Sequence, residues 1–495
     1  MKRIFKILTF VVAASVLYTC SDYLDVNQDP NNPTTDNVSP DMMLAGAMVQ
    51  SFPTMPTTAN RLGNLMTQAW AGDITNFTGA FQTEFSYDIT NTFYAAIWNN
   101  IYVNTSTFSL IASNEDPKYT NHNAIARIMK TYYFQYLVDL YGDIPYTEAH
   151  KLGGNIQPSY DDDEAIYGML LDELNTAISL INNAPLEALT VGNEDVMMGG
   201  DMAKWVRFAN TLKLRLLLRQ QATGIYNSQF ASLNGAEFIG AGDNVTINPG
   251  YADATGQLNP FYAQFHNVGG SNTSTAILYV PADYTAKFLT GETTQNSVTT
   301  NIYDPRVARL FTLEGGSING VVQGENDPAG ATPLSHLGPG LDIGPDQDGY
   351  IMTAAESLFL QAEAAYRNYI SGDAAALFRS GISESFSVLG IASAASAYLT
   401  SSENVNLIGW TGSSNKIEAI MTQKWIAQMG IHAVESWIEY TRTGYPVFPN
   451  PTIAQQPNRF NRLMYPITEY VGNAENVPTQ TSTDAFNTHI FWDVN

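Results

Sequence analysis

The sequence predicts a mainly α-helical protein in which pairs of helices alternate with long irregular segments. Apolar side chains recur at intervals of three and four residues, most clearly over residues 123–141, and this spacing is typical of helices with one buried face. Between the helical stretches, residues 71–95, 223–300 and 313–348 are rich in Gly, Asn, Thr and Pro. Loops of this length in a compact protein are usually functional, so they are the first place to look for ligand contacts.

The first 19 residues have the pattern of a secretory signal peptide. The basic residues Lys2, Arg3 and Lys6 precede an apolar run over residues 7–17, and this run is shorter than the roughly 20 residues that a membrane span needs. Cys20 follows directly and is the only cysteine in the chain. We therefore predict cleavage before Cys20 and lipidation of its thiol; a plain secreted protein and a short buried thiol are the alternatives.

The chain after the signal peptide divides into a tether and a folded region. Residues 20–40 are polar and rich in Asn and Pro, which predicts a lipidated N-terminal tether with turns. Helical spacing begins at Asp41. With 44% apolar residues and no later long apolar run, residues 41–495 are predicted to fold as a single α-helical domain with a large core.

Three early helices follow from apolar spacing and from end signals. The first covers residues 123–141, stops at Gly142 and cannot resume because of Pro145. The second begins at the acidic residues 161–164, which suit the positive end of a helix dipole, and continues to about residue 181. The third begins at Asp201, a typical N-cap residue, and runs through Leu216.

The later helices are joined by short corners. Residues 351–369 predict a helix with small residues on its inner face, and residues 372–373 form a tight corner into the next helix. A last pair covers residues 416–429 and 433–440. Antiparallel pairs of this kind stack into tetratricopeptide-like arrays, although the strict 34-residue spacing is not visible here.

The net charge excludes one class of partner. It is −24 for the whole chain, and removal of residues 1–19 takes away three positive charges and no acid, which makes it −27. Such a surface repels phosphate backbones and anionic lipid headgroups, so we expect no nucleic-acid partner. Attachment to a membrane would have to come from the lipid on Cys20.

Two irregular segments, residues 70–98 and 259–272, combine the side chains that bind sugars. Aromatic faces stack on the C–H surfaces of sugar rings, and planar amides and carboxylates bond the hydroxyl groups. The predicted ligand-binding residues are Trp70, Asn76, Phe77, Phe81, Tyr87, Trp98, Phe261 and Tyr262. Packing in the core is the alternative interpretation for each single ring, so the prediction concerns the two loops as a set.

The sequence contains no motif for catalysis or for metal binding. It has no G-x-S-x-G elbow, no H-E-x-x-H pair and no phosphate-binding glycine loop. Asp346 and Asp348 match only part of a calcium loop, and a plain turn is the simpler interpretation. We predict no cofactor, no metal site and no catalytic residue, while a carboxylate pair of a surface glycosidase stays open as an alternative.

Seven segments, in order along the chain, resemble those of the SusD/RagB lipoproteins. The first two read LVDLYGDIPYTEA and WVRFANTLKLR. The seven segments are residues 137–149, 205–215, 304–306, 355–364, 423–425, 442–446 and 462–466.

The resemblance implies a SusD-like fold and a function in nutrient uptake. Members of the family are outer-membrane lipoproteins that face the cell exterior, pair with a SusC-like TonB-dependent transporter and close over it like a lid. They bind glycans, or in some branches peptides, and do not cleave them. The expected function is capture of an oligosaccharide and its delivery to that transporter. A peptide-binding member and a non-catalytic surface scaffold are the alternatives.

Overall fold

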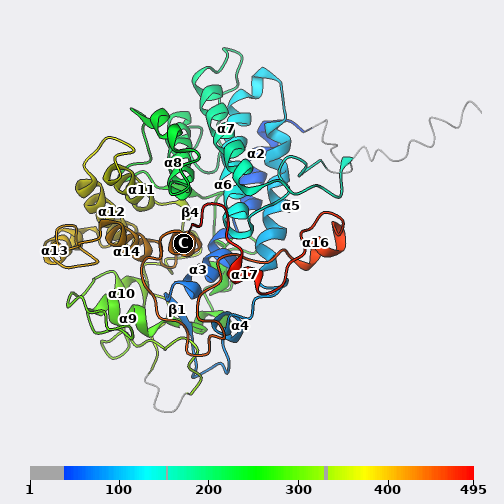
Figure 1. Cartoon of the computed structure of the whole chain (residues 1–495). Coiled ribbons are helices and arrows are strands. Elements are labelled where there is room, and N and C mark those ends of the chain that lie inside the picture. Colours follow the sequence, from blue (N-terminus) through cyan, green and yellow to red (C-terminus); the bar gives the residue numbers. More distant parts are fainter. Residues whose placement is uncertain (1–37, 152–153, 328–332, 495) are drawn as a thin grey trace, which may run out of the picture.

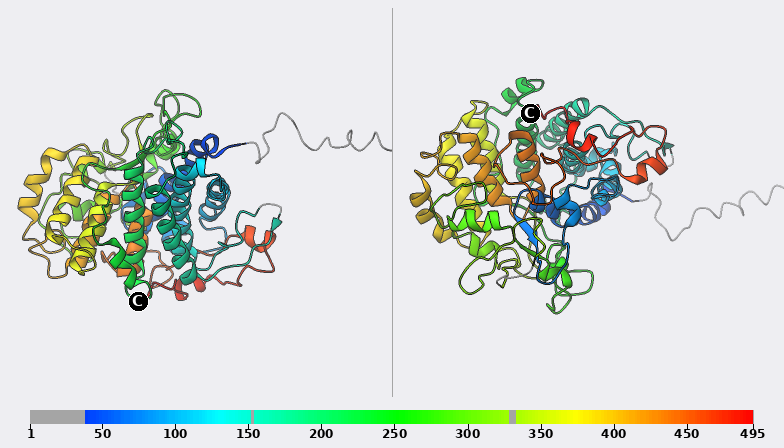
Figure 2. Two further views of the ribbon diagram at one scale, coloured as in Figure 1. Left: turned by 90° about the horizontal axis from the view of Figure 1, so that it is seen from above. Right: turned by 60° about the horizontal axis from the view of Figure 1, so that its bottom comes forward.

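The computed structural model describes residues 38–151, 154–327 and 333–494, and it is mainly α-helical, as predicted (Figure 1). Seven helices form a row in which each packs against the next, and Figure 2 (left) shows them side by side. In spatial order the row is α12 (Ala374–Val388), α11 (Ala354–Tyr366), α8 (Met202–Arg219), α7 (Asp163–Asn182), α6 (Thr120–Tyr141), α5 (Ala95–Ala112) and α2 (Pro40–Ser51).

A second set of helices packs against this row. In it α14 contacts α11 and α15, and α15 contacts α3; their bounds are α14 (Lys416–Gln428), α15 (Ala433–Thr443) and α3 (Asn60–Met66). Shorter helices lie among the loops: α4 (Gln82–Ser86), α9 (Asp283–Thr290), α10 (Val307–Leu310), α13 (Ala395–Ser402), α16 (Ile467–Gly472) and α17 (Asp484–Asn487). Among the helices of the described residues, none combines the length and the apolarity that a membrane span requires.

The predicted helix ends are close to the observed ones where a capping residue marks them. The Asp162 carboxylate accepts a hydrogen bond from Ala165 N–H at the start of α7, and the Asp201 carboxylate accepts one from Lys204 N–H at the start of α8. Gly142 ends α6. The prediction was wrong for α11, which begins at Ala354 and not at residue 351, because residues 349–352 form a strand and Thr353 is the N-cap.

Two small antiparallel sheets lie in the irregular segments and were not predicted. Strand β1 (Trp70–Gly72) pairs with β3 (Tyr279–Pro281), and β2 (Val245–Ile247) pairs with β4 (Gly349–Met352). Strands of three or four residues are too short to show an alternating pattern. Each sheet joins segments that are more than 100 residues apart, so both depend on the tertiary fold.

Two family-motif residues, Lys424 and Arg442, meet Arg219, Glu435 and Glu439 in a buried group of charges that we call the core ion network. The Arg219 guanidinium on α8 lies 2.7 Å from the Glu435 carboxylate and 3.2 Å from Glu439, both on α15. The Lys424 ammonium lies 3.1 Å and 2.9 Å from the same two carboxylates. Burial alone would raise the pKa of Glu439, but Arg442, Lys424 and Arg219 hold that pKa well below its usual value. Glu439 therefore stays ionised, and the network joins α8, α14 and α15.

Two of the motif arginines, Arg215 and Arg442, link one helix to another. Arg215 donates to the Glu356 carboxylate at 3.0 Å and so links α8 to α11, and Arg442 donates to Glu363 at 2.7 Å and links α15 to α11. Arg306 instead anchors a loop, since two of its nitrogens bond the Asp304 carboxylate.

The signal peptide, the lipidation at Cys20 and most of the tether were predicted for residues that lie outside the described part of the chain. Helical structure begins at Pro40, one residue before the predicted start of the folded region.

Candidate ligand-binding site

Strands β1 and β3 bring the two predicted binding loops together. Gly72 pairs with Tyr279 and Ala71 with Val280, and the Asp73 N–H donates to the Leu278 carbonyl at 2.9 Å. The loop over residues 73–88 leaves the end of β1, and the loop over residues 259–278 leads into β3. We call the surface formed by these two segments the two-loop face; it lies around β1 and α4 in the lower part of Figure 1.

A cluster of aromatic rings holds the two-loop face in place. The Tyr279 ring centroid lies 4.8 Å from that of Trp70, 5.4 Å from that of Phe81 and 5.8 Å from that of Phe265. The Phe81 and Tyr279 rings are stacked. Trp70 and Tyr279 are buried, whereas Phe81 is half-buried. The Tyr279 ring therefore covers one side of the Phe81 ring, and part of the Phe81 surface stays accessible.

The first loop is ordered by the buried carboxylate of Asp73. It accepts hydrogen bonds from the Thr75 N–H at 2.7 Å and from the Asn76 Nδ2 at 2.6 Å. Burial raises the pKa of Asp73, but these bonds outweigh it and lower the pKa below its ordinary value. The charged Asp73 therefore fixes the exposed Asn76 amide in one orientation, while the amide oxygen makes no hydrogen bond within the described residues.

The backbone of this loop is in an unusual conformation. Phe81 and Tyr87, which flank α4, both have φ of 59°, and Tyr94 has φ of 52°. Bulky residues rarely adopt positive φ, and each such residue costs about 1–3 kcal/mol, which the surrounding structure must offset. Backbone of this kind is frequent at functional sites, but six further non-glycine residues of the described chain also have positive φ.

The second loop contributes buried rings. The Asn259 side-chain oxygen accepts hydrogen bonds from the N–H groups of Phe261 and Tyr262, at 2.9 and 3.2 Å. The Phe261 ring packs edge-on against Phe265, and the Tyr262 ring lies 4.5 Å from the His266 ring. Phe261 also lines a cavity of only about 30 Å³, which has room for little more than one water molecule.

Trp98 lies away from the two-loop face, on α5. Its indole N–H donates to the Glu469 carboxylate at 3.2 Å, and that carboxylate also accepts from the Tyr160 hydroxyl at 2.7 Å. The ring borders a hollow of about 470 Å³ between α5 and α16, which the exposed Val103 and Ile156 also line. We call this the α5–α16 hollow.

The structure thus separates the predicted ligand-binding residues into two groups. Asn76 is exposed and Phe77 and Phe81 are half-buried on the two-loop face. The other five, Trp70, Tyr87, Trp98, Phe261 and Tyr262, are buried. Large rings gain most by packing against the core, so burial is the favoured outcome for most of them. Ligand contact stays a prediction for all eight, and it is sterically simplest for the first three.

A larger hollow near the C-terminus was not predicted from the sequence. It has a volume of about 640 Å³ and is formed by the end of α15, residues 444–461 and residues 486–493. Its lining includes Asn450, Asn458, Asn461, Asn487 and Arg459. We call it the C-terminal hollow. The repeated asparagines of residues 450–461 were a signal in the sequence, but the contribution of Asn487 arises only in three dimensions.

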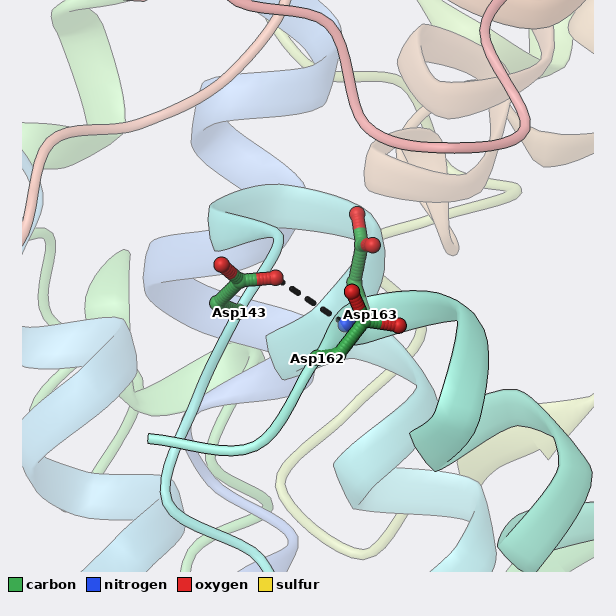
Figure 3. Close-up of side chains that lie close together, drawn as sticks. All are labelled: Asp143, Asp162 and Asp163. Atoms are coloured by element: carbon green, nitrogen blue, oxygen red, sulfur yellow. Dashed lines mark hydrogen bonds between the residues drawn. The ribbon is translucent and has the colours of Figure 1, made fainter. Parts of the chain in front are cut away.

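Three carboxylates meet where the segment after α6 passes the start of α7. Possible ligand oxygens of Asp143, Asp162 and Asp163 all lie within 4.8 Å of one another, the one such group in the part of the chain that the structure describes (Figure 3). The Asp163 N–H donates to Asp143 at 3.0 Å, and Asp163 accepts from the Phe491 N–H at 2.9 Å. These bonds account for the cluster as a junction between three chain segments.

Asp163 should make the stability of the protein depend on pH. Burial, opposed by the bond from Phe491 and reinforced by Asp143 and Asp162, raises the pKa of Asp163 from 3.8 to about 6. Its contribution to stability is therefore fully present below the unfolded pKa and is lost as the pH rises through the folded pKa. As the pH rises from 4 to 7, we expect the stability of Asp163→Asn, measured by thermal unfolding, to fall less than that of the wild type. The matched control is Asp172→Asn, an exposed position on α7, which should follow the wild type; identical curves for Asp163→Asn would contradict the prediction.

The fold and the two-loop face define a class of protein, a stacked-helix scaffold in which long loops form one face. Residues 30–466 match the model of a SusD-like family described as starch-binding and associating with the outer membrane. The match covers most of the chain, so the protein belongs to this family, which confirms the resemblance seen in the sequence. No curated protein matches the sequence.

Solved structures confirm the SusD-like fold. A chitin-binding protein is 24% identical with a TM-score of 0.73, and the match covers 92% of this chain and 100% of that one. A chitin-binding SusD homologue from Flavobacterium johnsoniae is 22% identical with a TM-score of 0.72, over 91% and 99% of the two chains. A SusD homologue from Parabacteroides distasonis ATCC 8503 is 23% identical with a TM-score of 0.72, over 92% and 98%.

Proposed function

We propose that this protein binds an extracellular oligosaccharide at the outer membrane and delivers it to a SusC-like TonB-dependent transporter. The lipid on Cys20 would hold the chain at the membrane with the folded region, residues 41–495, facing the cell exterior. The proposal rests on one observation above all: β1 and β3 join the two predicted loops into one face that exposes Asn76, Phe77 and Phe81. Membership of a family described as starch-binding supports it.

Binding would combine stacking with hydrogen bonds to hydroxyl groups. Phe77 and Phe81 offer ring surface, and Asn76 offers an amide oxygen held in place by Asp73. Each aromatic contact adds about 0.5–1.5 kcal/mol beyond burial, so a few of them give weak and reversible capture. Weak binding suits a protein that hands its ligand on, and nothing in this mechanism requires a bond in the ligand to break.

Removal of one ring should weaken glycan binding. We expect Phe77→Ala and Phe81→Ala each to raise the Kd for an oligosaccharide by about two- to tenfold, since each loses one stacking contact. Calorimetric titration with maltooligosaccharides and chitooligosaccharides measures this. The control is Tyr366→Ala, which removes an exposed ring on α11. If the wild type binds no oligosaccharide, or if the control weakens binding equally, the proposed site is wrong.

The handover can be tested with the full-length, lipidated chain extracted from membranes. We expect a TonB-dependent β-barrel to co-purify with it, and Cys20→Ala to release the chain from the membrane. If no barrel co-purifies under conditions that preserve other outer-membrane complexes, the delivery step is wrong and only the binding function remains.

A peptide ligand is the second candidate. The α5–α16 hollow supports it, because exposed Val103 and Ile156 give this hollow an apolar lining that suits apolar side chains better than sugar hydroxyls. Mass spectrometry of material that co-purifies with the protein separates the candidates: hexose or amino-sugar ladders support the glycan, and peptide fragments support the alternative.

A further inference from the structure

The C-terminal hollow has the size and the accessibility of a binding site. Its volume of about 640 Å³ lies within the range of about 300–1,000 Å³ that ligand pockets occupy. The side chains of Asn458 and Asn487 are exposed and make no hydrogen bond within the described residues. Each amide therefore keeps its full capacity to donate and to accept. Sugar hydroxyls also donate and accept, so these two groups match a glycan well.

The hollow also offers an aromatic wall. The half-buried rings of Tyr440 and Phe486 both line it. The Asn461 amide donates to the Phe486 carbonyl at 2.9 Å and so joins two of the segments that form the hollow.

Arg459 is the most unusual group in this hollow. It is 6% exposed, and its guanidinium lies over the Tyr440 ring at 5.3 Å and the Phe448 ring at 5.6 Å. It donates to the Pro449 carbonyl at 2.6 Å and to the Tyr440 hydroxyl at 3.4 Å, two bonds for a group with five N–H donors. Within the described residues no carboxylate forms an ion pair with it, in contrast to the buried Arg219 and Arg306. Arg459 therefore has donors left for the oxygen atoms of a ligand.

The hollow adjoins the two-loop face through α4. The Tyr87 hydroxyl, directly after α4, donates to the Asn450 side chain at 3.2 Å, and the Gln455 N–H donates to the Ser86 carbonyl at 3.1 Å. Phe81 directly precedes α4. Only the five residues of α4 therefore separate Phe81 from Tyr87, the residue that contacts the lining of the hollow.

We propose that the C-terminal hollow is a second glycan subsite, which binds the continuation of a chain whose other part lies on the two-loop face. The inference rests on the proposed function and adds a prediction about length. Short oligosaccharides occupy one of the two places, whereas longer ones occupy both and bind more tightly.

The test compares the double variant Asn458→Ala/Asn487→Ala with the wild type. Both positions are exposed, so the variant should fold with an unchanged Tm. Maltooligosaccharides and chitooligosaccharides from disaccharide to heptasaccharide are titrated by calorimetry. We expect wild-type affinity to rise with length, and the double variant to lose about fivefold or more for the longest ligand while it binds the shortest ligand like the wild type. Asn182→Ala, at an exposed asparagine at the end of α7, is the control and should show no loss.

Two results would overturn the proposal, and they differ from each other. If the double variant and the wild type show the same affinity at every length, the hollow is no subsite, although the proposed function survives. If the wild type binds none of the sugars, both the subsite and the proposed function are wrong.

Discussion

Arg219→Met should destabilise the protein by about 3–5 kcal/mol, the cost of removing one partner from a buried group of charges. The guanidinium is fully buried and lies within 3.3 Å of carboxylate oxygens of Asp139, Glu435 and Glu439. Methionine fills much of the same volume but carries no charge. Lys424 still contacts the Glu435 and Glu439 carboxylates, but it would have to offset much of their charge without Arg219. Thermal and urea unfolding followed by circular dichroism measure the loss.

The matched control for this prediction is Arg379→Met. The Arg379 guanidinium pairs with the Glu403 carboxylate at 2.7 Å, but their side chains are 39% and 24% exposed. Exposed ion pairs contribute about 0–1 kcal/mol because water screens them, so this variant should unfold close to the wild type. Equal losses in the two variants would mean that burial does not decide the value of these charges, and the structural role of the core ion network would have to be rejected.

Gly63→Ala should cost about 3 kcal/mol or more, because α3 and α15 approach each other at this glycine. A Cβ added to Gly63 would lie 2.0 Å from the carbonyl carbon of Ala433 and 2.1 Å from the nitrogen of Val434. Both are backbone atoms, so no side-chain rotation relieves the overlap and the two helices must move apart. Overpacking of a core costs about 1–3 kcal/mol, and occasionally more where the backbone must shift. A fall in Tm and in the free energy of unfolding is the readout.

Gly46→Ala is the opposite case on another helix. Gly46 lies inside α2, and a Cβ there would meet no atom within 4 Å. Alanine in an exposed helix interior is more stable than glycine by about 0.5–1 kcal/mol, so this variant should gain stability. If Gly63→Ala is as stable as the wild type, the close approach of α3 and α15 is not present in solution.

Much of the fold was predictable because its signals are local. Helices α6, α7 and α8 have apolar residues at helical spacing, a capping aspartate before α7 and before α8, and a glycine after α6, all readable within about 20 residues. The start of α11 was misjudged because Ile351 is apolar and fits a helix pattern equally well, yet it lies in β4, which pairs with β2 about 100 residues earlier. Short apolar runs do not distinguish a strand from a helix end.

The candidate site was predictable only as a pair of loops. Residue type identified aromatic and amide side chains in both segments, but it could not tell Phe81, which is half-buried, from Trp70, which is buried. Both rings pack against Tyr279, about 200 positions away, and the tertiary fold decides how far each of them is covered. The C-terminal hollow escaped prediction because its wall joins Asn458 and Asn487, which are about 30 residues apart with only the short helices α16 and α17 between residues 458 and 488.

The sequence by itself determined the order and approximate limits of the main helices, the acidic net charge and the family motifs, because helix periodicity and motif residues are properties of neighbouring positions and net charge follows from composition. The tertiary structure decided which charged motif residues form the core ion network, which aromatic rings stay accessible, and where surfaces become hollow. Those outcomes depend on contacts between segments far apart in the chain, where the burial of one side chain is set by the packing of all its neighbours.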